Sequence, residues 1–131
     1  MKRLVLLFAI VITVMAAKAQ NTITITVNGQ TRTATLADTQ AARELAALLA
    51  DGPITVNMSD YGGFEKVGDL PKSLTTTNRQ TTTEPGDIML YLGRSIVIFY
   101  GSNSWSYTPL GKIEGATASD IRGFLSGSNI A

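Results

Sequence analysis

Two apolar runs near the middle of the chain restrict its fold more than any other feature. The runs occupy residues 88–92 (IMLYL) and 95–100 (SIVIFY), and Gly93-Arg94 separates them. Two apolar runs joined by a glycine-containing turn are typical of a β-hairpin. Because nearly every position in both runs is apolar, both faces of this hairpin must be covered. A sheet that curls round on itself, with a helix packed on its outside or end, provides such cover, so we expect a closed antiparallel β-barrel.

Alternation of polar and apolar residues predicts the other strands. Residues 22–27 (TITITV) alternate without a fault, Asn28-Gly29 favours a type I′ turn, and residues 31–36 continue the alternation, which indicates a second hairpin. Alternation returns over residues 54–58 and ends at a Gly-rich bend at residues 60–63. Two further strand candidates are residues 64–67 and residues 106–113.

Two helices and one long loop complete the predicted elements. Asp38 or Thr39 can cap a helix whose apolar residues recur at helical spacing and which Gly52-Pro53 ends. Ser119-Asp120 can cap a short second helix near the end of the chain. We interpret the Thr-rich residues 70–83 as an extended surface loop. The expected fold is therefore mainly β, with about eight strands and two capping helices.

The first 19 residues have the three-part pattern of a signal peptide. Two basic residues precede an apolar stretch from Leu4 to Met15, which is shorter than the ~20 residues that a membrane-spanning helix needs. Ala17-Lys18-Ala19 supplies the small residues of a cleavage site. We therefore divide the chain into a signal peptide at residues 1–19 and one domain at residues 20–131. This domain is expected to be secreted across the inner membrane, to be periplasmic or extracellular, and to have no stable membrane insertion after cleavage.

Composition excludes several classes of function. Removal of Lys2, Arg3 and Lys18 with the signal peptide leaves eight Lys and Arg against ten Asp and Glu, a formal charge of −2. No segment of the domain clusters basic residues, so we expect no nucleic-acid partner. The chain has no Cys and no His, which excludes disulfides, thiol nucleophiles, Ser-His-Asp triads and zinc sites built from thiolate or imidazole. We expect neither a metal nor a cofactor, and the sequence leaves the oligomeric state open.

Several short motifs, in a fixed order along the chain, carry a resemblance to a known family. They are Met58-Ser59-Asp60, Glu65-Lys66, Asp69-Leu70-Pro71, residues 86–91 (GDIMLY), Phe99-Tyr100 and residues 106–113 (SYTPLGKI). In this order they resemble the bacterial cyclophilin-like domain family, over about Ile23 to Gly127. The resemblance implies a closed antiparallel β-barrel with capping helices, and a final strand that is short or missing in this chain.

The resemblance does not bring an activity with it. True cyclophilins are peptidyl-prolyl cis-trans isomerases with an Arg near a Phe, a second Phe, a Gln, and Trp or His around an apolar proline pocket. This chain has no Phe-x-Arg segment and no His. We therefore assign no catalytic residue.

Side chains in or beside the predicted loops are candidates for a binding site. The candidate ligand-binding residues are Tyr61, Glu65, Arg79, Arg94, Trp105 and Tyr107. Tyr61, Trp105 and Tyr107 can line a groove for an extended peptide or a small apolar ligand. Alternatively, Trp105 and Tyr107 close one end of the barrel. Arg79 or Arg94 is the donor to test for an isomerase, and Arg94 at a hairpin tip is otherwise solvated turn surface or a contact for a ligand carboxylate.

Three carboxylates lie beside glycines in predicted turns. Asp60, Glu65 and Asp87 could form a paired-carboxylate site or a calcium loop. The Asp-x-Asp-x-Asp-Gly spacing of a calcium loop is absent, so we expect Asp87 to accept a hydrogen bond from the turn backbone. Glu65 and Lys66 are equally candidates for a charge pair at the rim.

Three classes of function are compatible with these observations. The first is a secreted binding module that holds a peptide or small ligand beside its aromatic residues. The second is an extracytoplasmic peptidyl-prolyl cis-trans isomerase, which needs only a proline pocket and one donor to the amide nitrogen. The third is a structural or interaction domain without a ligand, with the Thr-rich segment as contact surface.

Overall fold

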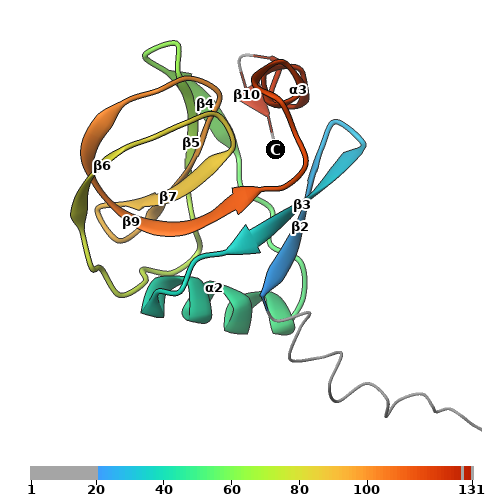
Figure 1. The fold of residues 1–131 in the computed structure, drawn as a ribbon. Coiled ribbons are helices and arrows are strands. Elements are labelled where there is room, and N and C mark those ends of the chain that lie inside the picture. Colours follow the sequence, from blue (N-terminus) through green and yellow to red (C-terminus); the bar gives the residue numbers. More distant parts are fainter. Residues whose placement is uncertain (1–20, 128, 131) are drawn as a thin grey trace, which may run out of the picture.

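The computed structural model describes residues 21–127, 129 and 130, and the predicted signal peptide at residues 1–19 lies outside these described residues. The described chain folds into one antiparallel sheet with two helices (Figure 1). The strands are β2 (Thr22–Val27), β3 (Gln30–Leu36), β4 (Met58–Tyr61), β5 (Glu65–Asp69), β6 (Arg79–Thr82), β7 (Asp87–Tyr91), β8 (Ser95–Phe99), β9 (Ser104–Ile113) and β10 (Asn129–Ile130). The helices are α2 (Gln40–Ala50) and α3 (Ala118–Phe124).

The sheet forms an open half-barrel and not a closed barrel. Its strands follow the order β10-β4-β5-β8-β7-β9-β3-β2, and β6 pairs with β9. Within the described residues, the end strands β10 and β2 do not pair with each other. The expectation of a closed β-barrel is therefore wrong, while the mainly β, antiparallel fold with two helices is confirmed. Side chains of α2 and α3 join the core beside both end strands, so the core is covered without closure of the sheet.

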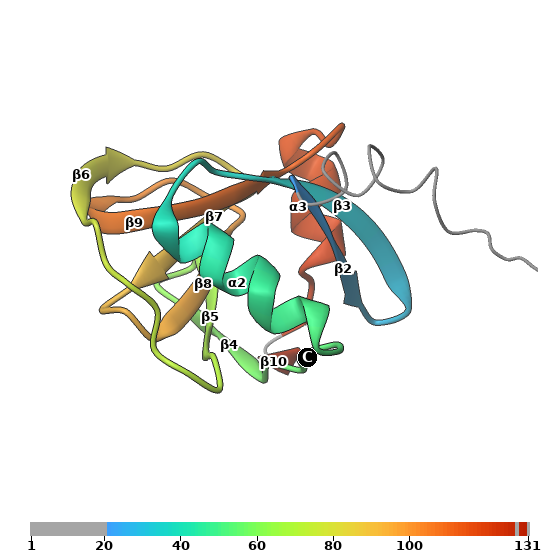
Figure 2. The ribbon, with the colours of Figure 1, turned by 90° about the horizontal axis from the view of Figure 1, so that it is seen from below.

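The β7–β8 hairpin is covered on both faces, as its apolar sequence predicts. Ile88 and Ile98 belong to the main core, to which both helices contribute. Val97 and Phe99 belong to a second, smaller core that they share with Tyr107 of β9. We call the first side of the sheet the helix face and the side that carries Val97, Phe99 and Tyr107 the aromatic face. Figures 1 and 2 place β6 at one end of the molecule and the β2–β3 hairpin at the opposite end.

The first hairpin and the first helix form as their local sequences predict. Asn28 (φ 51°) and Gly29 (φ 80°) both adopt the left-handed backbone that a type I′ turn requires. Thr39 is the N-cap of α2, because its Oγ1 accepts a hydrogen bond from the Ala42 N–H at 3.1 Å. The same hydroxyl donates to the Pro109 carbonyl at 2.7 Å, which ties the start of α2 to β9.

Two strands differ from their predicted positions. The strand expected over residues 54–58 is found at β4, from Met58 to Tyr61. The segment before it lies against β5, where a Cβ atom on Gly68 would be only 2.3 Å from the Asn57 carbonyl oxygen. Strand β6 lies inside residues 70–83, which were predicted to be a loop. Its partner, the first half of β9, is more than 20 residues away in the sequence, so no short turn joins the two strands and the local pattern does not predict their pairing.

The C-terminal elements are short. Thr117, not Ser119, caps α3, and its hydroxyl and the Asp120 carboxylate form a reciprocal capping box. Strand β10 contains two residues and pairs with β4, which confirms the expectation of a short final strand. In the part of the chain that the structure describes, neither helix has the length and apolar character needed to span a membrane.

Candidate functional site

A pocket of about 730 Å³ opens on the aromatic face of the sheet. We call it the aromatic pocket, and its lining residues are Tyr61, Gly62, Phe64, Glu65, Val67, Tyr91, Asn103, Trp105 and Tyr107. These residues come from strands β4, β5, β7 and β9 and from the segments beside them. The volume falls within the ~300–1,000 Å³ typical of small-molecule sites.

Strand pairing brings the lining side chains to one face of the sheet. Tyr61 of β4 lies opposite Glu65 of β5, and Glu65 lies opposite Phe99 of β8. Residues directly opposite each other in antiparallel strands, and residues two apart in one strand, point to the same face. Trp105 and Tyr107 are two residues apart in β9, so their side chains also point to the same face.

A glycine turn shapes one rim of the aromatic pocket. Gly62 and Gly63 join β4 to β5 with φ values of 65° and 74°, which residues with a side chain rarely adopt. A Cβ atom on Gly62 would lie 2.2 Å from the Phe64 ring, so the turn leaves room for that ring. The Phe64 ring packs edge-on against Tyr61, with centroids 6.0 Å apart, and stacks on Phe99 at 6.4 Å.

The opposite wall is held by hydrogen bonds and ring contacts. The Asn103 amide Nδ2 donates to the Tyr107 hydroxyl at 2.8 Å, and Thr83 binds the Asn103 backbone through both its N–H and its hydroxyl. The Tyr107 ring contacts Tyr91 edge-on with centroids 6.1 Å apart. Tyr107 is 3% exposed, whereas Trp105 is 56% exposed and forms the outer part of the wall. Of the two residues for which a purely structural role was the alternative, Tyr107 is part of the smaller core, whereas Trp105 is mostly exposed.

Glu65 is a buried carboxyl in the wall of this pocket. It is only 6% exposed. Among the residues that the structure describes, none donates a hydrogen bond to its carboxyl group or forms an ion pair with it. Burial, assisted by the negative charge of Asp60, raises the pKa of Glu65 to about 7. Because buried polar groups nearly always have a partner, this carboxyl is a candidate ligand-binding group whose charge changes near neutral pH.

Lys66 does not neutralise Glu65, because consecutive residues in a strand point to opposite faces. Lys66 lies on the helix face, donates to the Gly127 carbonyl, and places its Nζ 3.5 Å from Asp60 Oδ1. A hydrogen bond from the Tyr100 hydroxyl lowers the pKa of Asp60, so this carboxylate stays ionised. The candidate rim charge pair between Glu65 and Lys66 is therefore wrong.

The structure brings together four of the six candidate ligand-binding residues. Those that line the aromatic pocket are Tyr61, Glu65, Trp105 and Tyr107. Arg94 lies at the β7–β8 turn, where its Nε donates to the Leu70 carbonyl at 2.6 Å. Arg79 is exposed on β6 at the position opposite Tyr107 and does not line the pocket.

The other five lining residues were not predicted from the sequence. They are Gly62, Phe64, Val67, Tyr91 and Asn103. Two of them carried a usable signal, because Val67 lies two residues after Glu65 in a predicted strand and Tyr91 lies in the apolar hairpin. The pairing of these strands, which the local pattern does not specify, decides that their side chains meet.

The remaining predicted carboxylate has a structural role. Asp87 Oδ2 accepts a hydrogen bond from the Glu84 N–H at 2.8 Å, which confirms the expected contact with the turn backbone. Its Oδ1 also lies 3.3 Å from the Lys112 Nζ. Within residues 21–127, 129 and 130, no group of three or more acidic side chains is placed to hold a metal ion.

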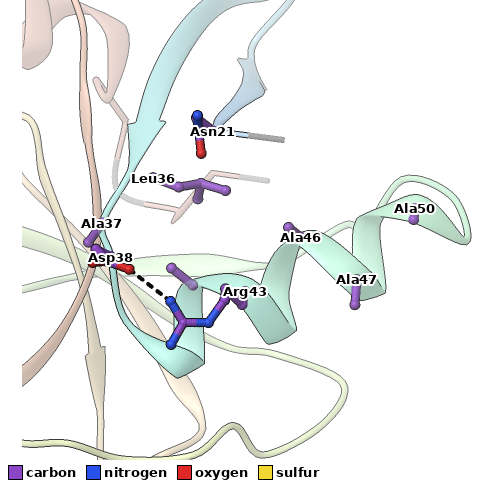
Figure 3. A pocket seen from close by; sticks show the side chains of 9 residues that line it. Asn21, Leu36, Ala37, Asp38, Arg43, Ala46, Ala47 and Ala50 are labelled. Atoms are coloured by element: carbon purple, nitrogen blue, oxygen red, sulfur yellow. Dashed lines mark hydrogen bonds and ion pairs between the residues drawn. The ribbon is translucent and has the colours of Figure 1, made fainter. Parts of the chain in front are cut away.

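A second hollow of about 590 Å³ lies between α2 and the end of β3 (Figure 3). Its walls are mainly alanine side chains, together with Asn21 and Leu36. Its two charged lining residues, Asp38 and Arg43, already form an ion pair at 2.8 Å, drawn as a dashed line in Figure 3. This hollow therefore offers a ligand no unpaired charged group among its lining residues, and the aromatic pocket is the stronger candidate.

Comparison with known proteins agrees with this fold. The model of the cyclophilin-like family matches residues 25–128, which confirms the resemblance predicted from the sequence motifs. No curated protein and no solved structure matches the chain. Because members of one fold family perform different functions, a function must be argued from the aromatic pocket itself.

Proposed function

The chain belongs to the cyclophilin-like family, and on this scaffold we propose a secreted domain that binds a small ligand, or one side chain of a peptide, in the aromatic pocket. The observation that carries the proposal is Glu65, a buried carboxyl without a partner among the described residues, in the wall of a ring-lined pocket. Leaving a buried polar group unpaired costs about 1–3 kcal/mol, and a ligand that pairs with it recovers that cost.

The pocket has the composition of a small-ligand site. Its rings supply apolar contact area, and Glu65 and Asn103 supply a small number of polar groups that can orient a ligand. The outer rings of Tyr61 and Trp105 are 63% and 56% exposed, an unusual exposure for large aromatic side chains. A bound ligand would cover part of both rings.

Export from the cytosol is the second part of the proposal. It is supported by the signal-peptide pattern in residues 1–19. The test is N-terminal sequencing of the protein recovered from the periplasm and the medium. A mature chain that begins at Gln20 is expected, and an intact Met1 in the cytosol would contradict export.

The alternative function, peptidyl-prolyl cis-trans isomerase, has less support. The isomerase mechanism needs a donor to the amide nitrogen beside an apolar pocket. Neither candidate arginine lines the aromatic pocket, and the Arg94 Nε already donates to a backbone carbonyl. A protease-coupled assay of proline isomerisation, with several residues before the proline, tests this alternative. Acceleration above the uncatalysed rate would establish it.

Ligand binding is tested through Trp105, the single tryptophan of the chain. The chain is titrated with proline-containing peptides and with small apolar compounds while Trp105 fluorescence is followed. In a blocked variant, Val67→Phe, a larger side chain fills the pocket, and binding should be lost. The matched control is Ala47→Phe, at an exposed position of α2, which should bind as the natural chain does.

Two results would contradict the binding proposal. The first is the absence of any fluorescence change with every compound. The second is equal binding by Val67→Phe and the natural chain, which would place the ligand elsewhere. The first result would favour the third hypothesis, a structural or interaction domain without a ligand.

A further inference from the structure

The unpartnered carboxyl of Glu65 also indicates which class of ligand the aromatic pocket takes, an inference that rests on the proposed binding function. An ionised carboxylate has acceptor positions for about four hydrogen bonds, and no described residue uses any of them. A buried charge is tolerated only when it is paired. We propose that the aromatic pocket binds a protonated aliphatic amine, whose ammonium group donates hydrogen bonds to Glu65 and whose apolar body packs against the surrounding rings.

The rings around Glu65 suit a cation with an apolar body. Five of the lining residues are aromatic, namely Tyr61, Phe64, Tyr91, Trp105 and Tyr107. The face of an aromatic ring is electron-rich and attracts a cation, and Trp attracts it most strongly. An ammonium group in this pocket would therefore interact favourably with both the ring faces and the carboxylate. An uncharged ligand of the same shape would gain only apolar contact.

The charges that reach Glu65 from the neighbouring strands also favour a cation. Asp60 of β4 is the charged group that acts on Glu65, and its charge is negative. Tyr107 of β9 and Tyr100 at the end of β8 interact electrostatically with Glu65, and both phenols have raised pKa values. They are therefore uncharged near neutral pH. An anionic ligand would meet the repulsion of Asp60 and Glu65.

The nearby basic residues do not occupy the place of the amine. Lys66 lies on the helix face, with its Nζ near Asp60 and the Gly127 carbonyl. Arg79 is exposed on β6 and is not a lining residue. In the described part of the chain, no Lys or Arg forms an ion pair with Glu65.

Protonation of Glu65 gives the proposal a pH dependence with a definite sign. The pKa of this carboxyl is raised to about 7 by burial and by Asp60. An aliphatic amine stays protonated throughout the range from about pH 5 to pH 8.5, so only the carboxyl changes charge there. Amine affinity should be highest above pH 7 and fall by up to about tenfold for each pH unit below it.

The test compares amines with uncharged molecules of the same shape. The first pair is cyclohexylmethylamine and cyclohexylmethanol, which differ in the ammonium group and absorb little light where tryptophan is excited. The second pair is the peptide acetyl-Gly-Lys-Gly-amide and its norleucine counterpart, which asks whether the amine can be a lysine side chain. Trp105 fluorescence and calorimetry at pH 8.5 measure the dissociation constants. At least one amine should bind about tenfold more tightly than its uncharged partner.

Two substitutions separate the carboxylate from the rings. Glu65→Gln keeps the shape of the side chain, removes its charge, and should weaken amine binding about tenfold while changing alcohol binding by less than about twofold. Tyr61→Leu should weaken amine binding about two- to fivefold by loss of a ring, whereas the control Tyr61→Phe keeps the ring and the affinity. Cooperative unfolding of each variant shows that it is folded.

The outcomes distinguish failure of this inference from failure of the proposed function. If the uncharged molecules bind as tightly as the amines, or if Glu65→Gln leaves their ratio unchanged, the amine inference is overturned and ligand binding stands. Stronger amine binding at pH 5.5 than at pH 8.5 would also overturn it. If neither member of either pair binds and no other compound perturbs Trp105, both the inference and the proposed function are wrong.

Discussion

Replacing the Glu65 carboxyl with an amide should change how stability depends on pH. The fold raises the pKa of Glu65 from the ordinary value of 4.5 to about 7 and buries the group to 6% exposure. The native state therefore holds a proton that the unfolded chain releases between these two values. As a result, the free energy of unfolding falls as pH rises through this window. The interval from 4.5 to about 7 corresponds to about 3 kcal/mol of unfolding free energy, which is lost by pH 8.5.

The Glu65→Gln variant has no such proton to release, so its free energy of unfolding should not fall in this way as pH rises. The free energy of unfolding of the variant minus that of the natural chain should therefore rise by about 3 kcal/mol between about pH 4.5 and pH 8.5. Urea unfolding at both pH values, followed by Trp105 fluorescence and circular dichroism, measures this difference. An equal effect of the substitution at both pH values would refute the claim that Glu65 is buried without a partner.

The matched control is Glu44→Gln on α2. Hydrogen bonds from the Thr75 hydroxyl and N–H lower the pKa of Glu44 below its ordinary value of 4.5, the opposite direction to that of Glu65. Relative to the natural chain, Glu44→Gln should therefore destabilise the protein at least as much at pH 8.5 as at pH 4.5. A relative gain of stability at pH 8.5 in this control would show that the assay reports a general response of the protein and not the titration of Glu65.

Three further predictions concern the framework of the fold and can be measured by urea unfolding. Phe99→Ala should cost about 3–5 kcal/mol, because Phe99 is fully buried between the Phe64 and Tyr107 rings; a loss below about 1 kcal/mol would contradict this packing. Gly111→Ala should cost more than about 2 kcal/mol, because its Cβ atom would lie 2.4 Å from a backbone oxygen of β3, and a neutral effect would contradict the close approach. Thr39→Ala should cost about 1–2 kcal/mol through loss of the α2 cap, whereas Thr39→Ser, which keeps the hydroxyl, should restore most of it.

Local sequence patterns were sufficient for the elements that neighbouring residues stabilise. The alternation over residues 22–36 and the Asn28-Gly29 dipeptide specify the β2–β3 hairpin, because turn and strand preferences act between adjacent residues. Thr39 and the spacing of apolar residues specify α2 for the same reason. The apolar sequence of residues 88–100 also required cover on both faces, and both covering clusters are present.

The structure of the aromatic pocket was only partly predictable. Tyr61, Trp105 and Tyr107 were predicted to be site residues because aromatic side chains in or beside loops can line a groove. The environment of Glu65 could not be predicted from its neighbours in the chain. Its burial and raised pKa depend on strands β4, β8 and β9, which are brought beside it by pairing.

The sequence by itself determined the mainly β composition, the two local hairpins, the start of α2 and the family of the fold. Only the tertiary structure decided that the sheet stays open, that β6 forms within a Thr-rich segment, and that Glu65 faces a pocket without a partner among the described residues. The physical reason is the range of the interactions. Periodicity and turn chemistry act over a few residues, whereas strand pairing, burial and the pKa of a buried carboxyl are set by residues that are distant in the chain and close in space.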